Sequence, residues 1–244
     1  GTVTWKANFG QDSTFGGTIS AGGNADANGF GDFKYAPPSG YTCISSSSIP
    51  ISDDIDPAQT DDDYPSKQCT AVTFTGNGGT NNITGVGFQA DLAIFKNRGT
   101  ANSWIVVDSS RGGTGSGTKS LNTNGNGAES TGAYTTWNGF ASDGFNLSGG
   151  GTGTINQSSA NMYGQLWRAN GGTTASNSDG SITSTVQSST AGGFSIITYT
   201  GTGSNATIGH GLSAKPDFIL FKRRSGSGEN WQVYHSSLGA TKYL

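Results

Sequence analysis

The apolar residues of this chain come in short runs rather than at the spacing of an amphipathic helix. Each run is bounded by Gly, Asn, Ser or Asp, as in AVTFTG, DLAIFKN, WIVVD, GFSIITYTG, DFILFKR and WQVYH. Runs of this length predict β-strands, several of them buried on both faces, and the small polar residues between them predict glycine-rich turns. The pattern therefore predicts an all-β fold of antiparallel β-sandwich modules, of jelly-roll or concanavalin-like type, with glycine-rich loops at their rims.

Composition favours a folded β protein over a disordered chain. Charged residues make up 12% of the 244 residues, whereas an ordinary soluble domain has roughly 25%. Low charge with 41 glycines is also typical of disorder, but disordered chains are poor in aromatic and β-branched residues. Here aromatics reach 10%, and Val, Ile and Thr recur in clusters.

The chain contains an internal repeat with a period of about 125 residues, which is the size of a domain. The stretch VTFTG, which begins at Val72, aligns with ITYTG at Ile197. Further along, Asp91 aligns with Asp217, and the motif KNR aligns with KRR. The repeat predicts four parts: terminal strands of an upstream module in 1–50, an acidic loop in 51–70, a complete β-sandwich repeat in 71–193, and the first strands of a second, incomplete repeat in 194–244.

Charge and hydropathy exclude two classes of partner. A formal net charge of −3 leaves no basic surface for nucleic acid or anionic membranes. No apolar run approaches the ~20 residues that span a bilayer, and GTVTWKANFG lacks the regions of a signal peptide. We expect no nucleic-acid partner and no membrane insertion. Either the chain is exported by a route that this sequence does not show, or it is one segment of a longer product.

The residue pattern predicts no catalytic site, and we expect a protein that is not an enzyme. The two histidines, His210 and His235, both lie in the second repeat, where they align with Val86 and Asp108 of the first. A triad or metal site would therefore need residues that the complete copy lacks. No carboxylate spacing suggests a glycosidase pair.

Two cysteines, Cys43 and Cys69, flank an acidic stretch. A disulfide between them would close this loop and suit an extracellular protein, and the alternative is two unpaired thiols in apolar pockets. Calcium, which takes six to eight oxygen ligands, is a candidate cofactor of the loop, and a solvated acidic loop is the alternative. Otherwise we expect no cofactor. The candidate calcium ligands are Asp53, Asp54, Asp56, Asp61, Asp62 and Asp63.

Aromatic side chains raise the question of glycan binding. Trp104 and Trp231 occupy equivalent positions beside apolar residues, so we expect both in the core. Other aromatics lie near polar loops and are candidates for stacking on sugar rings: Tyr134, Trp137, Tyr163 and Trp167. We also expect Asp91 and Asp217 to pair across a loop with the Lys and Arg of KNR and KRR.

Several motifs in order along the chain resemble one family. NFGQ, then YAPPSGY, VTFTGNG, SDGFNLSG and GQLWRANGG are similar to virion proteins of tailed bacteriophages, common in marine phages. These are tail-fibre or other structural proteins with SPRY-like or concanavalin-like β-sandwich modules. The chain departs from the family in its acidic insertion between Pro50 and Cys69, in Cys69 itself, where the family usually has an apolar residue, and in its abrupt end.

The resemblance implies a non-enzymatic structural protein of a phage particle, in a tail fibre or in a capsid fibre or decoration. Its location would be the virion or extracellular space. Its partners would be other virion subunits, in a homo-oligomer that presents loops to host surface glycans. Two alternatives are a lectin-like glycan-binding module and a homopolymeric extracellular filament subunit with strand exchange. Because the second repeat is incomplete, we expect that the chain is not complete as an isolated monomer.

Overall fold

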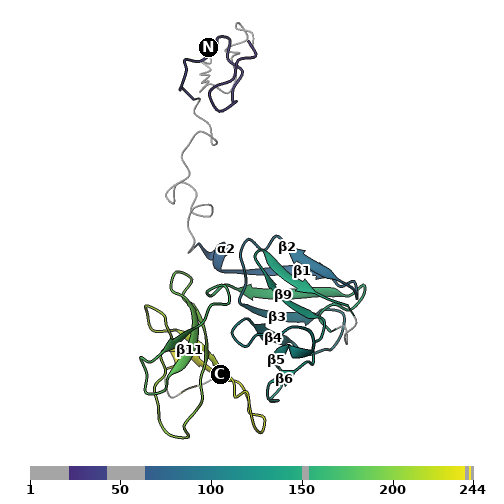
Figure 1. Ribbon diagram of the computed structural model, residues 1–244, viewed down its shortest axis with the longest axis vertical. Helices are drawn as coiled ribbons and strands as arrows, with labels where there is room; N and C mark the ends of the chain where they lie inside the picture. Colours follow the sequence, from purple (N-terminus) through teal and green to yellow (C-terminus); the bar gives the residue numbers. More distant parts are fainter. Residues whose placement is uncertain (1–21, 43–63, 150–153, 240–241, 243–244) are drawn as a thin grey trace, which may run out of the picture. The chain divides into compact units, whose positions relative to one another are not determined.

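The computed structural model describes residues 22–42, 64–149, 154–239 and 242 of the chain. The chain divides into two compact units, Gly1–Thr60 and Asp61–Leu244. The second unit contains every helix and strand of the described residues, as Figure 1 shows. Its sheets are antiparallel and its one α-helix, α2 (Pro65–Gln68), has four residues. The predicted all-β, antiparallel sandwich-type fold is confirmed.

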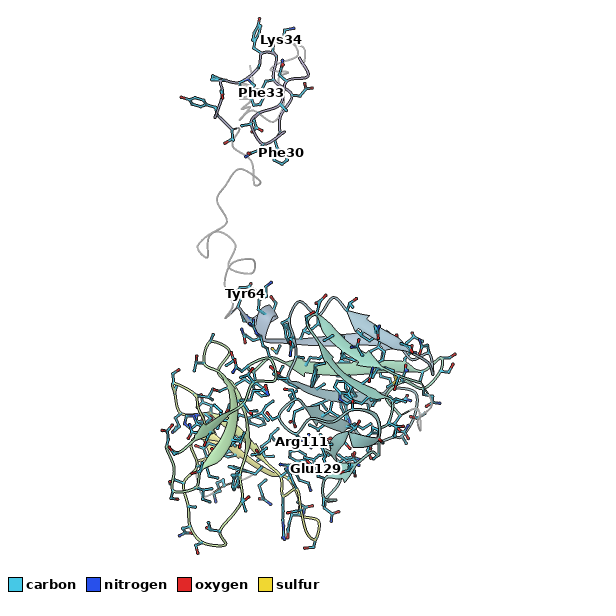
Figure 2. All side chains as sticks on the ribbon, viewed as in Figure 1. Phe30, Phe33, Lys34, Tyr64, Arg111 and Glu129 are labelled. Atoms are coloured by element: carbon cyan, nitrogen blue, oxygen red, sulfur yellow. The ribbon has the colours of Figure 1, made fainter. Side chains whose placement is uncertain are left out.

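In the first unit, residues 22–42 form a turn held by one isolated bridge. Asn24 and Phe33 face each other in an antiparallel bridge. The Asp26 carboxylate accepts hydrogen bonds from the backbone N–H groups of Asn28 and Phe30, both at 2.9 Å. Phe30 and Phe33 are labelled in Figure 2. The terminal strands predicted for 1–50 are therefore not formed within 22–42, the described part of this unit.

The largest sheet of the second unit has six strands in the order β1-β9-β3-β4-β5-β6 (Figure 1). β9 lies between β1 and β3 and pairs with both in antiparallel register. β3 alternates half-buried and buried residues, which is the pattern of a sheet with one face on a core. The strands are β1 (Cys69–Thr75), β9 (Asn161–Trp167), β3 (Leu92–Asn97), β4 (Ile105–Asp108), β5 (Lys119–Asn122) and β6 (Ser130–Thr131).

A second sheet, β2-β8-β7, completes the sandwich. Its strands are β2 (Asn81–Thr84), β8 (Gly144–Leu147) and β7 (Trp137–Ala141). Aromatic rings from the two sheets meet in the core: the Phe95 ring lies 5.0 Å from Phe145 and 5.7 Å from Trp137. All three side chains are at least 97% buried. Apolar burial on this scale is the main favourable term in the stability of the sandwich.

Two smaller sheets follow along the chain. β10 (Ala175–Asn177), β11 (Ser184–Ser189) and β12 (Phe194–Thr198) form one, and β13 (Phe218–Phe221) and β14 (Gln232–His235) form the other. Of two short 3-10 helices, η1 (Gly115–Gly117) lies between β4 and β5, and η2 (Ser236–Leu238) follows β14.

The internal repeat extends to the register of strand pairing. β3 and β4 pair with Leu92 opposite Asp108, and β13 and β14 pair with Phe218 opposite His235. These positions are equivalent in the repeat. The two hairpins also close in the same way, because Ser109 N donates to the Asp91 carbonyl and Ser236 N to the Asp217 carbonyl, both at 2.8 Å.

Two of the predicted borders differ from the structure. α2 and the first residues of β1 fall inside the range 51–70, which was predicted as an acidic loop. The predicted border between residues 193 and 194 cuts a hairpin, because β12 pairs with β11 and places Phe194 opposite Ser189. The strand that opens the second copy is thus paired with the strand that closes the first.

Candidate functional site

Asp91 is a fully buried carboxylate just before β3 and accepts several hydrogen bonds. Its Oδ2 accepts hydrogen bonds from the backbone N–H groups of Ala169 at 2.7 Å and Gly171 at 2.9 Å, and its Oδ1 accepts one from Gly172 at 2.7 Å. Ser109 Oγ donates to Oδ1 at 2.8 Å. A buried carboxylate with this many donors fixes the turn after β9 against the start of β3.

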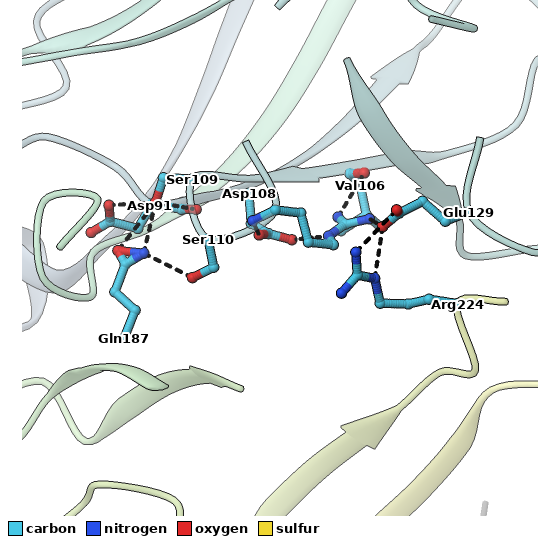
Figure 3. A network of polar contacts seen from close by, with 9 residues as sticks. Asp91, Val106, Asp108, Ser109, Ser110, Glu129, Gln187 and Arg224 are labelled. Atoms are coloured by element: carbon cyan, nitrogen blue, oxygen red, sulfur yellow. Dashed lines mark hydrogen bonds and ion pairs between the residues drawn. The ribbon is translucent and has the colours of Figure 1, made fainter. Parts of the chain in front are cut away.

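Gln187 of β11 extends this cluster into the next sheet and is also fully buried (Figure 3). Its Nε2 donates to Ser109 Oγ at 2.8 Å and to Ser110 Oγ at 3.0 Å. Its Oε1 accepts from Gly172 N at 3.0 Å. Each polar atom of the Gln187 side chain therefore has a partner on the sandwich, which ties β11 to it.

A second set of polar contacts centres on Arg111, which is labelled in Figure 2 and whose side chain is 4% exposed. Its Nε donates to Asp108 Oδ2, its Nη1 to Glu129 Oε2 at 3.2 Å, and its Nη2 to the Val106 carbonyl at 3.3 Å. Asp108 Oδ1 accepts from the Arg111 backbone N–H at 2.8 Å. The guanidinium thus binds two carboxylates and one backbone carbonyl of β4.

Glu129 also binds an arginine of the second repeat. Arg224 donates from Nε to Oε2 at 2.8 Å and from Nη2 to Oε1 at 3.0 Å, a bidentate pair. Burial raises the pKa of Glu129, but the hydrogen bonds from Arg224 and Arg111 outweigh it and hold this pKa below its ordinary value. The same bond raises the pKa of Arg224. Glu129 is therefore a carboxylate shared by two cations.

Three more contacts hold the β13-β14 hairpin to the sandwich. Trp231 Nε1 donates to the Asn122 carbonyl at 2.9 Å, and Lys222 Nζ donates to the Asn126 carbonyl at 2.9 Å. The Glu129 backbone N–H donates to the Arg224 carbonyl at 2.9 Å. Together with the ion pair, these contacts place the second hairpin against the loop between β5 and β6. The contacts form a polar seam between the second hairpin and the first copy.

A hollow of about 470 Å³ opens where the turn after β9 meets the loop before β3. Asp143 shapes one wall, because it accepts backbone hydrogen bonds from Gly87 at 2.6 Å and Gly85 at 3.0 Å. These bonds lower the pKa of Asp143. The lining is mostly polar and includes two cations and two amides, a set that suits a polar or anionic small ligand. Its main side chains are Lys67, Phe88, Gln89, Ser142, Arg168 and Asn170.

The four aromatic residues predicted as sugar contacts do not form one site. Trp137 is 3% exposed and belongs to the core, so it is not available to a ligand. Tyr134 is half-buried and donates from its hydroxyl to Asn122 Oδ1 at 2.9 Å. Tyr163 and Trp167 are half-buried on the same face of β9, and Trp167 stacks on Phe194. Tyr134, Tyr163 and Trp167 stay candidates for glycan contact.

Two other predictions about aromatic and charged side chains were wrong. Trp104 and Trp231 are half-buried rather than core residues. Asp91 does not pair with the Lys of KNR, since Lys96 donates to the Asn102 carbonyl and Asp91 binds backbone N–H groups. Lys222 makes the equivalent bond in the second copy, to the carbonyl two residues before its tryptophan.

The predicted disulfide and calcium site fall mainly outside the described residues. Cys69 has a free thiol in the structure and is exposed at the start of β1, while Cys43 lies outside the described ranges, so their pairing stays a prediction. The six aspartates from Asp53 to Asp63 also lie outside them. Within the residues that are described, no three His, Cys, Asp or Glu side chains gather as metal ligands.

The comparison with family models decides the family of the second unit. Residues 64–244 match a family described as a domain of unknown function, DUF7483. The chain belongs to the DUF7483 family. The matched range of this DUF7483 domain includes both predicted repeats. Comparisons with curated proteins and with solved structures find no match. In the described part of the chain, no helix has the length and hydropathy that crossing a membrane requires.

Sequence reasoning missed the residues that hold the DUF7483 domain together. Gln187 and Glu129 stand in polar stretches without a motif, and only the folded chain brings them to Ser109 and Arg224. For Asp91, the sequence held one weak indication of its acceptor role, which is the glycine pair of RANGG. The glycine pair of RANGG takes positive φ angles, which directs its N–H groups at a common acceptor.

Proposed function

We propose that the protein is a non-enzymatic structural component of a tailed-bacteriophage particle, in a tail fibre or in a capsid fibre or decoration. The observation that carries this proposal is the repeated hairpin. β3-β4 and β13-β14 share one register, and the second is fixed to the first copy through Arg224 and Glu129. Such modules, joined by polar seams, build stiff arrays, which suits a fibre that presents loops to a host. The resemblance of NFGQ, YAPPSGY and GQLWRANGG to virion proteins supports the same role.

The test is to find the polypeptide in assembled particles. Purified particles of the phage that encodes the chain should contain it by mass spectrometry, in many copies per particle. A gold-labelled antibody against the second unit should decorate the fibres or the capsid surface in electron micrographs. Particles that are infectious and lack the polypeptide would contradict the proposal. A purified chain that stays monomeric at high concentration would argue against the homo-oligomer.

A second candidate function is glycan binding by a lectin-like module, and the polar hollow favours it. Its lining combines the amides of Gln89 and Asn170 with the cations Lys67 and Arg168, groups that hydrogen-bond sugar hydroxyls and carboxylates. A glycan array should then show saturable binding that K67A abolishes. R223A, a change at an exposed arginine that does not line the hollow, is the matched control and should bind normally.

A further inference from the structure

Asn-Gly pairs are positions at which the protein backbone can react with a side chain. The glycine nitrogen attacks the asparagine side-chain carbon Cγ, and glycine allows this because it has no Cβ beside the attacking atom. The reaction needs a glycine N–H that can lose its proton and turn toward the side chain. This chain has six such pairs, which begin at Asn28, Asn77, Asn124, Asn126, Asn138 and Asn170.

In three of these pairs an acceptor holds the glycine N–H. Gly171 N donates to the buried carboxylate of Asp91 at 2.9 Å. Gly78 N donates to the Asn156 carbonyl at 2.9 Å, and Gly29 N donates to a backbone carbonyl at 3.0 Å. A nitrogen held in this way has to break its hydrogen bond before it can attack, so these pairs are protected.

The pair Asn138-Gly139 is restrained by the sheet. It lies in β7 between Trp137 and Phe140, and both of these residues pair with β8. Pairing on either side of Asn138-Gly139 limits the backbone rotation that brings the glycine nitrogen to the side chain. This pair is therefore protected as well.

The loop between β5 and β6 contains the other two pairs, Asn124-Gly125 and Asn126-Gly127. All four residues are exposed. Among the described residues, the N–H groups of Gly125 and Gly127 have no hydrogen-bond acceptor. Attack by the glycine nitrogen therefore needs less local opening in this loop than at the protected pairs.

The Asn126 carbonyl distinguishes the two pairs of this loop. It accepts a hydrogen bond from Lys222 Nζ at 2.9 Å, and the Glu229 carbonyl holds the same ammonium group. A cation on the carbonyl of a peptide group draws electron density from the nitrogen of that group, here the nitrogen of Gly127, and so makes its proton easier to remove. In the described part of the chain, the Asn124 carbonyl has no such partner.

We propose that Asn126 is a site of spontaneous deamidation, and that its product loosens the polar seam that holds the second hairpin. The Gly127 nitrogen loses its proton and bonds to Asn126 Cγ, the Cγ–Nδ2 bond breaks, and ammonia leaves. Water then opens the cyclic imide at either of its carbonyl carbons. The products are aspartate and isoaspartate at position 126, each with a new carboxylate. This site does not depend on the proposed role in a phage particle.

The loop packs too closely on the second hairpin to accept a longer backbone. A Cβ on Gly228 would lie only 2.4 Å from the Asn126 carbonyl oxygen. In isoaspartate the chain runs through the former side chain, so the backbone gains a methylene at this contact. Further along the loop, Glu129 N donates to the Arg224 carbonyl at 2.9 Å. The longer backbone shifts these partners apart, so the seam loses contacts.

Peptide mapping of the full chain tests the site. The protein is incubated in mildly alkaline buffer and digested with pepsin in acid, and tandem mass spectrometry gives the deamidation rate at each asparagine. Asn126 should react at least about tenfold faster than Asn77 and Asn170, whose glycines must first release a hydrogen bond. It should react at least about threefold faster than Asn124, which lacks the lysine contact. Equal rates at Asn126 and at any of these three residues overturn the proposal.

Two glycine variants separate the mechanism from mere exposure of the loop. A Cβ at Gly127 meets no atom within 4 Å and Gly127 has no positive φ, so G127A should fold normally. G127A should slow deamidation of Asn126 at least about fivefold, because a methyl group beside the nitrogen restricts its attack. G125A, at the glycine of the neighbouring pair, is the matched control and should leave the Asn126 rate unchanged. Equal rates in G127A and the intact chain overturn the proposal.

Hydrogen–deuterium exchange tests the loosening of the seam. Deamidated chains carry one more negative charge, so anion exchange separates them from intact chains. The amides of the β13-β14 ladder should exchange at least about threefold faster in the deamidated fraction, whereas those of β9 should not change. G127A that is incubated for the same time should keep the slower exchange. Equal exchange of β13-β14 in the two fractions overturns the loosening.

Discussion

Arg224 reaches 95 residues back along the chain to bind both carboxylate oxygens of Glu129, at 2.8 and 3.0 Å. The Glu129 side chain is 11% exposed and that of Arg224 is 41% exposed. The burial of this pair is thus intermediate between that of a buried and that of a surface ion pair. For such a pair, geometry decides how much it contributes to stability. It joins the second hairpin to the first copy, and its removal should loosen that hairpin before it unfolds the sandwich.

The substitution E129Q should lower the free energy of unfolding by about 1–3 kcal/mol, because two guanidinium groups lose a charged acceptor. Urea denaturation followed by tryptophan fluorescence measures this change. E229Q is the matched control, since the Arg223 and Glu229 side chains are 53% and 57% exposed. It should cost less than about 1 kcal/mol. Equal effects of the two variants would show that the Arg224 pair contributes no more than a surface pair.

The pH dependence of stability should report the same carboxylate. Burial raises the pKa of Glu129, but the arginine hydrogen bonds lower it more, so the folded-state pKa lies below the ordinary value of 4.5. A group of this kind stabilises fully above its unfolded pKa and loses this contribution as pH falls through the folded pKa. The melting temperatures of the intact chain and of E129Q should therefore differ at pH 7 and converge as pH falls below about 4.5. A difference that stays constant down to pH 3 would contradict this.

The substitution D91N should be among the most damaging polar changes in the chain. Asp91 accepts backbone hydrogen bonds on both oxygens, and an amide would turn one acceptor into a donor against an N–H group. We expect a loss of about 3 kcal/mol in the free energy of unfolding. The repeat offers a matched control, D217N, at the exposed counterpart. A D91N chain as stable as D217N would show that the buried carboxylate is not needed.

The substitution G164V should overpack the interface of β9 and β3. Its Cβ would lie 3.0 Å from Phe95 Cε1, 3.1 Å from Phe95 Cδ1 and 3.4 Å from Val72 Cγ2, and protein cores are close-packed. The expected loss is about 1–3 kcal/mol in the free energy of unfolding, measured by thermal or urea denaturation. G201V is the control, because a Cβ at Gly201 meets no atom within 4 Å. A stable G164V chain would mean that the Phe95 ring can move aside.

The sequence predicted the strands and their repetition because both depend on local patterns. Short apolar runs bounded by turn residues correspond to β3, β4, β13 and β14, and the alignment of Asp91 with Asp217 gives the register that both hairpins share. Strand identity of this kind follows from composition and periodicity. Each of these motifs occurs in both copies, so the strand predicted in one copy supports the strand predicted in the other.

Positions that depend on long-range packing were not predictable in this way. Trp137 has polar neighbours in sequence, so it resembled a surface residue, yet β7 pairs with β8 and brings Phe145 within 6.0 Å of it. The acceptor role of Asp91 depends on a turn 78 to 81 residues away. No local sequence pattern indicates contacts between residues so far apart in the chain. Alternation of apolar and polar residues also does not say which face of a strand packs on a second sheet.

The shared register of β3-β4 and β13-β14 also gives the molecule an internal reference for hydrogen–deuterium exchange. Equivalent residues of β3 and β13 lie opposite equivalent hairpin partners, and among the described residues the two strands differ in whether another strand pairs with their second edge. Amides that β3 donates to β9 exchange only when the sheet opens, whereas their counterparts at the open edge exchange with solvent directly. The ratio of the two rates, measured in one sample, gives the protection that one neighbouring strand confers on another.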